Sequence, residues 1–513
     1  MAEKMRPELS ALYERLSRTE DGVRSEAARK RHEKGFRTAR ENLADLVDPG
    51  TFLEYGQLAV AAQRSRRDPE DLQVNTAADG IITGVGSVNA ALVGDEAAQT
   101  AVLIGDYAVL AGTQGYFHHK KLDRMCELAE QLHLPAVMYT EGGGGRPGDT
   151  DIVTGVSGLD VRSFLSWARL GGIVPRIAVN NGYCFAGNAA LFGAADITIA
   201  TKTSYIGMAG PAMIEYGGLG KHAPTEIGPS DVQELNGVLD IVADDEAEAT
   251  AAAKKVLSYF QGRVREWHAP DQRPLRDALP EDRRFGYNVR RVIDTLADTG
   301  SFTELRRAHG RNVITGFMRL EGLPVGLVTS DCQHLAGAVD SVAAEKTARF
   351  LTLCDAFRLP IVVLTDTPGF MVGVDSERQG AVRKMSQLMV AGASVTVPIV
   401  NIILRKAYGL GAMALAGGSL AKPIYTAAWP TGEVGAMGLE GAVQLGYRKE
   451  LEAVSDPRER EALFEQLLRK LYAQGKATES ASFLEIDAVI DPADTRRTIV
   501  RALLAARAKR PTL

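Results

Sequence analysis

The sequence predicts an α/β fold made of two similar domains in tandem. Short runs rich in Val and Ile alternate with longer segments whose leucines recur at helical spacing, and glycine-rich turns separate them. The motifs of the first half also return in the second. Asp48-Pro-Gly-Thr-Phe-Leu-Glu recurs from position 298 and Leu134-Pro-Ala-Val-Met-Tyr-Thr-Glu from position 359, offsets of 250 and 225 residues. Solenoid repeats have periods of about 20 to 50 residues, so these offsets indicate duplicated domains.

The length of the chain agrees with two domains. A single hydrophobic core rarely grows beyond about 250–300 residues, and this chain has 513. We expect a first domain with a helical N-terminal arm at 1–267 and a second domain at 285–513. The polar, proline-containing stretch 268–284 is the expected linker.

Composition excludes several classes of function. With 45% hydrophobic and 24% charged residues, this is the composition of an ordinary globular protein. The net charge of −5 argues against binding to nucleic acid. The charged N-terminus resembles no signal peptide, and the apolar runs are far shorter than the roughly 20 residues of a membrane span, so we expect a cytoplasmic protein without membrane insertion. Four scattered cysteines predict neither a disulfide framework nor a metal site.

The elements of the first half follow in order. A stretch rich in Glu, Arg, Lys and Ala at 7–46 predicts a solvent-facing helical arm. Runs of β-branched residues bounded by glycine predict strands at 79–88 and 101–106. We then expect a helix at 120–132, a strand at 135–139, a helix at 164–170, a strand at 174–179 and an Ala-rich helix at 244–260.

The second half repeats this order. We expect strands at 313–317 and 324–329, a helix at 342–357, and strands at 361–365 and 397–404. Helices at 458–472 and 495–509 close the chain. Such alternation of strands and helices is typical of an α/β fold with crossover connections.

Two strand-to-helix turns are the strongest candidates for chemistry. They are Asn181-Gly-Tyr-Cys-Phe-Ala-Gly-Asn and Lys406-Ala-Tyr-Gly-Leu-Gly-Ala-Met, in which Ala186 and Gly187 match Gly411 and Ala412 at the offset of 225. Small residues there let backbone N–H groups point at an incoming oxygen, as an enzyme requires to stabilise a developing oxyanion. The alternative is that these glycines only permit close packing, which duplication would also copy.

Several other motifs can be interpreted as either functional or purely structural. Gly142-Gly-Gly-Gly-Arg-Pro-Gly-Asp could bind the phosphates of a nucleotide-like tail, but it lacks the Lys-Ser/Thr of a P-loop. His118-His-Lys-Lys and Arg405-Lys406 could meet anionic groups or simply be solvated charges. Cys184 could be a nucleophile, yet no histidine is near it in sequence, so a small buried residue is the better interpretation.

Motifs along nearly the whole chain resemble one family. They include Thr38-Ala-Arg-Glu-Asn, Tyr287-Asn-Val-Arg-Arg-Val-Ile, Asn312-Val-Ile-Thr-Gly-Phe, Ala344-Glu-Lys-Thr-Ala-Arg-Phe, Thr367-Pro-Gly-Phe, Arg405-Lys-Ala-Tyr-Gly and Ala428-Trp-Pro-Thr. The chain thus resembles the carboxyltransferase β subunit of biotin-dependent acyl-CoA carboxylases, the propionyl-, methylcrotonyl- and acetyl-CoA carboxylase group. That resemblance implies two tandem crotonase-like domains built from ββα repeats and related by internal duplication.

The resemblance also implies a reaction. A biotinylated carrier would bring carboxybiotin to the second domain, an acyl-CoA would bind the first, and the carboxyl group would pass to the α-carbon, or the vinylogous carbon, of the acyl group. Released biotin would be the base. The amides of Ala186 and Gly187 would hold the thioester oxygen, and those of Gly411 and Ala412 the ureido oxygen of biotin.

Further site residues are carried over on the matching motifs. Acyl-CoA would contact Gly143, Gly144, Gly145, Arg146, Cys184 and Phe185, and biotin would contact Thr367, Pro368, Gly369, Phe370, Tyr408, Gly409 and Leu410. No metal is expected. Since the chain contains no Ala-Met-Lys-Met attachment sequence and no ATP-binding domain, biotin and the biotin carboxylase and carrier are expected on separate chains. The family forms homo-hexamers, trimers of dimers with the site across a dimer interface.

The chain departs from the family in three turns. The usual Asp-Ser-Gly-Gly-Ala-Arg reads Glu141-Gly-Gly-Gly-Gly-Arg, Gly-Pro-Cys-Ala-Gly-Gly reads Gly182-Tyr-Cys-Phe-Ala-Gly, and Leu410 is inserted in the second-half turn with no Asp after it. The identity of the acyl group therefore stays open. Two alternatives stay open as well, the carboxyltransferase of an acyl-CoA decarboxylase that works with a membrane-bound pump, and an inactive assembly subunit.

Overall fold

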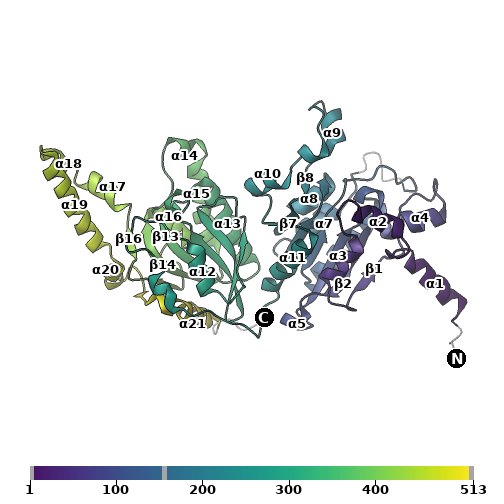
Figure 1. Ribbon diagram of the computed structural model, residues 1–513, viewed down its shortest axis with the longest axis horizontal. Coiled ribbons are helices and arrows are strands. Elements are labelled where there is room, and N and C mark those ends of the chain that lie inside the picture. The colour runs from purple at the N-terminus through teal and green to yellow at the C-terminus, as the bar shows by residue number, and fades with distance from the viewer. Residues whose placement is uncertain (1–4, 153–158, 508–513) are drawn as a thin grey trace. The chain divides into compact units, whose positions relative to one another are not determined.

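The computed structural model describes residues 5–152 and 159–507, and its chain forms two compact units, Met1–Gly262 and Arg263–Leu513 (Figure 1). Each unit has one main sheet with helices packed against it. The first sheet has seven strands in the order β1-β2-β3-β4-β5-β7-β9, and the second has the order β10-β11-β12-β13-β14-β15-β17, with β16 paired to β14. A small pair, β6-β8, completes the first unit.

The first unit contains eleven α-helices and nine strands within its described residues. The helices are α1 Pro7–Ser17, α2 Ser25–His32, α3 Ala39–Leu46, α4 Pro69–Asn75, α5 Ala90–Val93, α6 Tyr116–Leu132, α7 Ser163–Arg169, α8 Gly187–Gly193, α9 Pro211–Tyr216, α10 Ser230–Leu235 and α11 Glu246–Phe260. The strands are β1 Leu53–Tyr55, β2 Ile81–Ser87, β3 Gln99–Gly105, β4 Ala136–Tyr139, β5 Arg176–Asn180, β6 Tyr183–Phe185, β7 Ile197–Thr201, β8 Tyr205–Gly207 and β9 Ile241–Ala243.

The second unit follows the same plan. Its helices are α12 Val289–Leu296, α13 Ser341–Ala356, α14 Val374–Arg378, α15 Ala381–Ser394, α16 Gly409–Leu415, α17 Leu439–Gly446, α18 Arg448–Ala453, α19 Pro457–Gln474, α20 Ala477–Ser482 and α21 Thr495–Arg507. Its strands are β10 Thr303–Leu305, β11 Val313–Leu320, β12 Leu323–Ser330, β13 Ile361–Thr367, β14 Ile399–Tyr408, β15 Tyr425–Ala428, β16 Glu433–Gly435 and β17 Ala488–Val489.

The two sheets share their topology. In each, the first three strands are antiparallel and the rest of the sheet is parallel. Unusual backbone also recurs at the offset of 225. Ala111 and Ala336 have φ of 55° and 54°, and His133 and Arg358, which lie just after α6 and α13, have φ of 52° and 56°. Left-handed backbone is uncommon at residues other than glycine, so its recurrence supports a duplicated fold.

A buried lysine takes the same place in both units. Lys121 on α6 donates to the carbonyls of Ala78 and Ile81. Lys346 on α13 donates to four carbonyls, those of Arg306, His309, Gly310 and Val313. Burial lowers the pKa of Lys121 to about 8. These lysines satisfy carbonyl groups that the loops before and within the sheet would otherwise leave unpaired.

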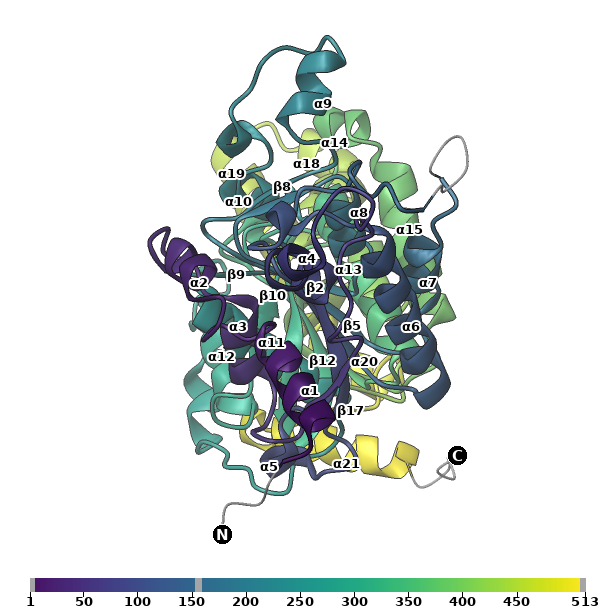
Figure 2. The same cartoon turned by 90° about the vertical axis from the view of Figure 1, so that its right-hand side faces the viewer.

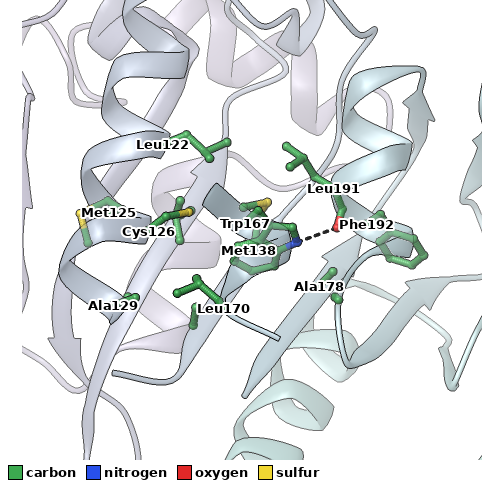
Figure 3. Close-up of a cluster of buried hydrophobic side chains, with 14 of the residues drawn as sticks. Leu122, Met125, Cys126, Ala129, Met138, Trp167, Leu170, Ala178, Leu191 and Phe192 are labelled. Carbon is green, nitrogen blue, oxygen red and sulfur yellow. Dashed lines mark hydrogen bonds between the residues drawn. The ribbon is translucent and has the colours of Figure 1, made fainter. Parts of the chain in front are cut away.

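The core of the first unit lies between α6, α7 and α8 and the parallel strands (Figure 3). Trp167 of α7 is fully buried there, and its indole N–H donates to the carbonyl of Leu191 at 2.9 Å. Leu122 and Met125 pack from α6. A large ring with one satisfied polar atom thus joins α7 to the helix that begins at the first candidate turn.

Three of the expected segments differ in detail from the structure. The stretch 7–46 is three helices, and Leu46 of α3 is fully buried, so the arm is partly integrated into the first unit. A capping box of Thr38 and Glu41 starts α3 and explains the break. The strand expected at 397–404 continues to Tyr408, because Lys406 pairs with Glu433 of β16. The expected linker 268–284 lies in the second unit, where Leu275 is buried.

Other expected elements are confirmed within three residues at each end, including α7, α11, α13 and α19, and α6 begins at Tyr116, four residues before its expected start. Positions 508 and 509 of the expected last helix lie outside the described residues. Helix α9 and its flanking loops extend away from the sheet of the first unit (Figure 2). Across residues 5–152 and 159–507, none of the helices is both long and apolar enough to cross a membrane.

Replacing Trp167 with Phe should lower the free energy of unfolding by about 1–3 kcal/mol, because the Leu191 carbonyl loses its buried donor. Chemical denaturation followed by circular dichroism measures the change. Trp267→Phe is the control, since that ring is 39% exposed. Equal stability of the two variants would contradict the importance of the indole hydrogen bond.

Candidate active site

The first candidate turn is built by a glycine loop lying beside β6. The N–H of Gly142 donates to the Tyr183 carbonyl at 2.8 Å, and the N–H of Phe185 returns to the Gly142 carbonyl at 3.0 Å. The N–H of Gly143 donates to Ala111 at 3.1 Å. The loop that follows β4 is therefore fixed against the strand that leads into α8.

Ala186 does not supply a free donor, which corrects the sequence expectation. Its N–H donates to the carbonyl of Gly207 in β8 at 3.1 Å. The residue has φ 52° and ψ −120°, a strained conformation that turns the chain sharply into α8. Gly187 then follows, and its N–H meets no protein acceptor in the described ranges 5–152 and 159–507. The amide that this turn offers is that of Gly187.

The close approach of the loop to the turn requires glycine at 144. Gly144 has φ 89°, and a Cβ there would lie 2.8 Å from the Cβ of Ala186. Its N–H donates to Oδ1 of Asn188 at 3.0 Å, and its carbonyl accepts the N–H of Gln114 at 2.7 Å. Gly145 is exposed next to it, and its N–H has no acceptor among the residues that the structure describes.

Three of the residues predicted to contact acyl-CoA have side chains that face the protein interior. The Arg146 side chain is 4% exposed, pairs with Asp79 and donates to the Thr113 carbonyl at 2.7 Å. Cys184 is fully buried, and burial raises the pKa of its thiol to about 12, which does not suit a nucleophile. Phe185 is also buried, with its ring stacked on Tyr183. These side chains therefore support the turn from the protein interior.

The second turn brings together the residues predicted to contact biotin. Gly411 lies so near the Gly369–Phe370 peptide that a Cβ would overlap the Gly369 carbonyl carbon and lie 2.5 Å from the Phe370 nitrogen. Thr367 fixes this loop, because its hydroxyl accepts the Gly369 N–H at 3.1 Å. In the described part of the chain, the amides of Phe370 and Gly411 have no protein acceptor. Ala412 was also expected to supply a donor, but it is the fourth residue of α16, so its N–H makes the first intrahelical bond, to the carbonyl of the cap residue Tyr408.

The flanks of the second turn differ from those of the first. Tyr408 is buried and donates its hydroxyl to Glu433, and burial and this carboxylate raise the pKa of Tyr408 far above its usual range. Gly409 has φ 57°, which allows the chain to turn into α16. Leu410 comes next and is 59% exposed. Pro368 is half-buried on the opposite loop. The rim of this turn is therefore apolar.

A buried acid lies beneath each glycine loop at the same place in the repeat. Glu141 forms a bidentate pair with Arg31 of α2, at 3.0 and 2.7 Å. Asp366 pairs with Arg405 of β14 at 3.0 Å and accepts the Lys406 N–H at 3.0 Å. Burial raises the pKa of Glu141 to about 7, while Arg31 acts to lower it. The sequence alone gave no sign that Arg31, 110 positions away, would meet this acid.

Polar residues around the first turn were also missed. Asn188 and Gln114 touch the loop directly, and the matching positions at the offset of 225 are Met413 and Val339. Comparison of the two halves could have found them, since a polar residue in one copy replaces an apolar one in the other. For His118 the sequence left open a contact with anionic groups or a solvated position. The side chain is buried, and burial lowers its pKa well below the usual value.

Both turns can stabilise negative charge on an oxygen. Each has a glycine loop and a strand-to-helix turn in contact, with one N–H group on the loop and one on the turn that lack an acceptor among the described residues, namely Gly145 and Gly187 in the first unit and Phe370 and Gly411 in the second. Preorganised backbone donors of this kind lower the energy of an oxyanion without a charged side chain. Within the described residues, no group of three or more His, Cys, Asp or Glu side chains is placed to hold a metal ion.

Comparisons with known proteins agree on one family. A model of the carboxyl transferase domain matches residues 30–513. The methylmalonyl-CoA carboxyltransferase 12S subunit of Propionibacterium freudenreichii subsp. shermanii is 33% identical, covering 100% of this chain and 96% of its own. A crystal structure of transcarboxylase 12S, described as a hexamer assembly with methylmalonyl-CoA and methylmalonic acid bound, has TM-score 0.86 and 30% identity, covering 100% of this chain and 97% of its own.

A third match is a single-chain, multi-domain long-chain acyl-CoA carboxylase. It is 53% identical with TM-score 0.92, and the match covers 97% of this chain and 49% of that one. The chain thus spans about half the length of this relative.

Replacing Arg31 with Met should destabilise the protein by about 3–5 kcal/mol, because Glu141 would remain buried without its partner. The pKa of Glu141 would then rise above its present value of about 7, further from that of the unfolded chain. A carboxyl group whose pKa is raised by folding loses stabilisation as the pH rises through that pKa, so the defect should be larger at pH 8 than at pH 6. Thermal unfolding at both pH values measures it.

The double variant with Arg31→Met and Glu141→Gln serves as the control. It removes the charge, so it should recover part of the stability and lose the extra pH dependence. A single variant as stable as the wild type at pH 8 would contradict the role assigned to this pair.

Proposed function

This chain belongs to the carboxyl transferase family and is a carboxyltransferase of the biotin-dependent acyl-CoA type, and from that premise we propose a division of labour between its two turns. The turn of the first unit holds the thioester oxygen of an acyl-CoA. The turn of the second unit holds the ureido oxygen of biotin. The carboxyl group then passes from carboxybiotin to the α-carbon of the acyl group.

The observation that carries this proposal is that each unit has one amide on its glycine loop and one on the adjoining strand-to-helix turn without an acceptor among the described residues. Carboxyl transfer from carboxybiotin to an acyl-CoA needs two oxyanions to be stabilised, one on the enolate of the thioester and one on the urea of biotin. Two sites that share one backbone design suit two carbonyl oxygens, and neither site needs a metal or a charged side chain near the reacting atoms.

On the acyl side, the donors are the amides of Gly187 and Gly145 instead of the pair Ala186 and Gly187 first expected, because the Ala186 amide is already bonded. Gly143 and Gly144 shape the loop, and the buried side chains of Arg146, Cys184 and Phe185 support it from behind. Arg146 therefore contributes through its backbone and its bond to Asp79, and a direct contact between its guanidinium and CoA phosphate is not part of the proposal.

On the biotin side, the residues present fit a small apolar bicyclic urea. Among the described residues the amides of Phe370 and Gly411 have no acceptor, and Leu410 and Pro368 offer apolar surface beside them. These two amides are the donors, because the Ala412 amide bonds within α16. Bound carboxybiotin would supply the activated carboxyl group. Thr367, Gly369, Tyr408 and Gly409 hold the loop and the turn in contact, so the donors are fixed before biotin arrives.

The assembly belongs to the proposal as well. Because the 12S relative is described as a hexamer, we expect this chain to form a homo-hexamer, and it would take carboxybiotin from a biotin carboxylase and carrier partner. A cytoplasmic location is part of the same expectation. Capture of the biotinylated partner, followed by a carboxylation screen over acetyl-, propionyl-, methylcrotonyl- and long-chain acyl-CoA, identifies both partner and substrate. Failure to carboxylate any acyl-CoA with the captured partner would argue for an assembly subunit.

Replacing Gly411 with Ala should reduce transfer of labelled carboxyl from methylmalonyl-CoA to free biotin by about a hundredfold or more, the usual loss when an oxyanion donor is removed. The added Cβ would press on the Gly369–Phe370 peptide and displace the amides. Binding of propionyl-CoA, measured by calorimetry, should stay within about twofold of the wild type, because the first unit is untouched. Gly441→Ala, whose Cβ would lie no nearer than 3.5 Å to a neighbour, is the control.

Replacing Gly144 with Ala should have the opposite pattern. The Cβ would meet the Cβ of Ala186 at 2.8 Å in a backbone with φ 89°, so the loop must move away from Gly187. We expect propionyl-CoA to bind at least about tenfold more weakly, as about 1.4 kcal/mol of lost contact requires. Gly193→Ala at the end of α8 has no atom within 4 Å of its Cβ and is the control. Unchanged affinity in Gly144→Ala would place the acyl group elsewhere.

A further inference from the structure

Gln114 lies next to the acyl-side turn, and its side-chain Nε2 has no hydrogen-bond partner in the part of the chain that the structure describes. It precedes α6, and its backbone runs beside the glycine loop, donating to the Gly144 carbonyl at 2.7 Å and accepting the Arg146 N–H at 2.9 Å. These two bonds fix its position relative to the loop. The side chain is therefore held at the site whether or not a ligand is present.

The carboxamide of Gln114 lies against Gly187. A Cβ at Gly187 would overlap Oε1 of Gln114 and lie 3.3 Å from its Cδ, so the side-chain amide and the free backbone amide are immediate neighbours. The residue is only 3% exposed. A ligand oxygen that approached the Gly187 N–H would thus meet the Gln114 carboxamide as well.

Nε2 of Gln114 has no hydrogen-bond partner among the described residues. A buried N–H without an acceptor costs about 1–3 kcal/mol. Such a cost is retained where a ligand supplies the acceptor, and the donor here adjoins a backbone amide that also lacks one. A half-turn of the carboxamide about its Cγ–Cδ bond exchanges Oε1 with Nε2 and brings N–H to the side of Gly187.

The second unit shows that the fold does not need this amide. Val339 occupies the matching position, and its backbone makes the same two bonds, donating to Gly369 at 3.0 Å and accepting from Met371 at 2.8 Å. Val339 is fully buried. An apolar side chain therefore satisfies the packing, and the polar one in the first unit has another purpose.

We infer that the Gln114 carboxamide is a side-chain donor to the thioester carbonyl oxygen of the bound acyl-CoA, beside the Gly187 amide. This inference rests on the proposed acyl-CoA site in the first unit. It names a further contact to the reacting group, one that the backbone turn of the second unit lacks. As the carbonyl becomes an enolate, the donor strengthens its bond to the oxygen, so it favours the transition state over the ground state.

The test pairs a change in the protein with a change in the ligand. Propionyl-CoA carries the carbonyl oxygen, and S-propyl-CoA, a thioether, lacks it. Gln114→Val copies the second unit, and Gln114→Glu keeps the shape but removes both N–H donors. Calorimetry with the full chain gives the dissociation constants of both ligands, and thermal unfolding checks that each variant is folded. We expect Gln114→Val to be at least as stable as the wild type.

The wild type should prefer propionyl-CoA over S-propyl-CoA, and both variants should lower that preference by about fivefold, the value of one neutral hydrogen bond near 1 kcal/mol. The turnover of carboxyl transfer to free biotin should fall by about tenfold or more, since the bond strengthens at the enolate. An unchanged preference with unchanged turnover in a folded variant overturns the inference. A wild type that binds neither ligand would instead overturn the proposed acyl-CoA site.

Discussion

The close approach of two backbone segments is the constraint on which both candidate sites depend. In each unit the loop after a central strand touches the turn that starts a short helix, Gly144 against Ala186 and Gly369 against Gly411. A side chain at either glycine would force the segments apart. Among the described residues, the Gly187 and Gly411 amides at these contacts have no acceptor. The proposed donors therefore depend on how these segments pack, and the sheet and its helices bring the segments together.

The two units keep this contact by different means. Asp366 is anchored by Arg405, which comes from the strand next to its own. The matching acid, Glu141, is anchored by Arg31 of the N-terminal helices, whose guanidinium also lies over the ring of Phe36. The arm is thus part of the acyl-side site. Glu141 stands where the family motif usually has Asp, and its longer side chain pairs with Arg31 of this arm.

Polarity separates the two turns further. The first has Gln114 and Asn188 against its loop, where the second has Val339 and Met413. The second has an exposed Leu410 at its rim, where the first has the buried Phe185. The two turns therefore have similar backbones but differ in the side chains around them. The two proposed ligands also differ in polarity, since one is a thioester at the end of a long polar carrier and the other is a compact bicyclic urea.

The sequence by itself determined the fold class, most strands and helices, and which strand-to-helix turns recur in both halves. Hydrophobic periodicity, glycines at turns and repeated motifs can all be read from the chain without knowing which distant segments pair. Gly187 and Gly411, which the sequence predicted as donors, have amides without an acceptor among the described residues, whereas the Ala412 amide, predicted with them, bonds within α16. Only the tertiary structure decided that the Ala186 amide is bound to Gly207, that the Arg146 guanidinium faces Asp79, and that Arg31 and Gln114 belong to the site. Those facts depend on pairing between segments far apart in the chain, and neither the composition nor the spacing of residues encodes which carbonyl, carboxylate or amide will be within reach once the sheet has formed.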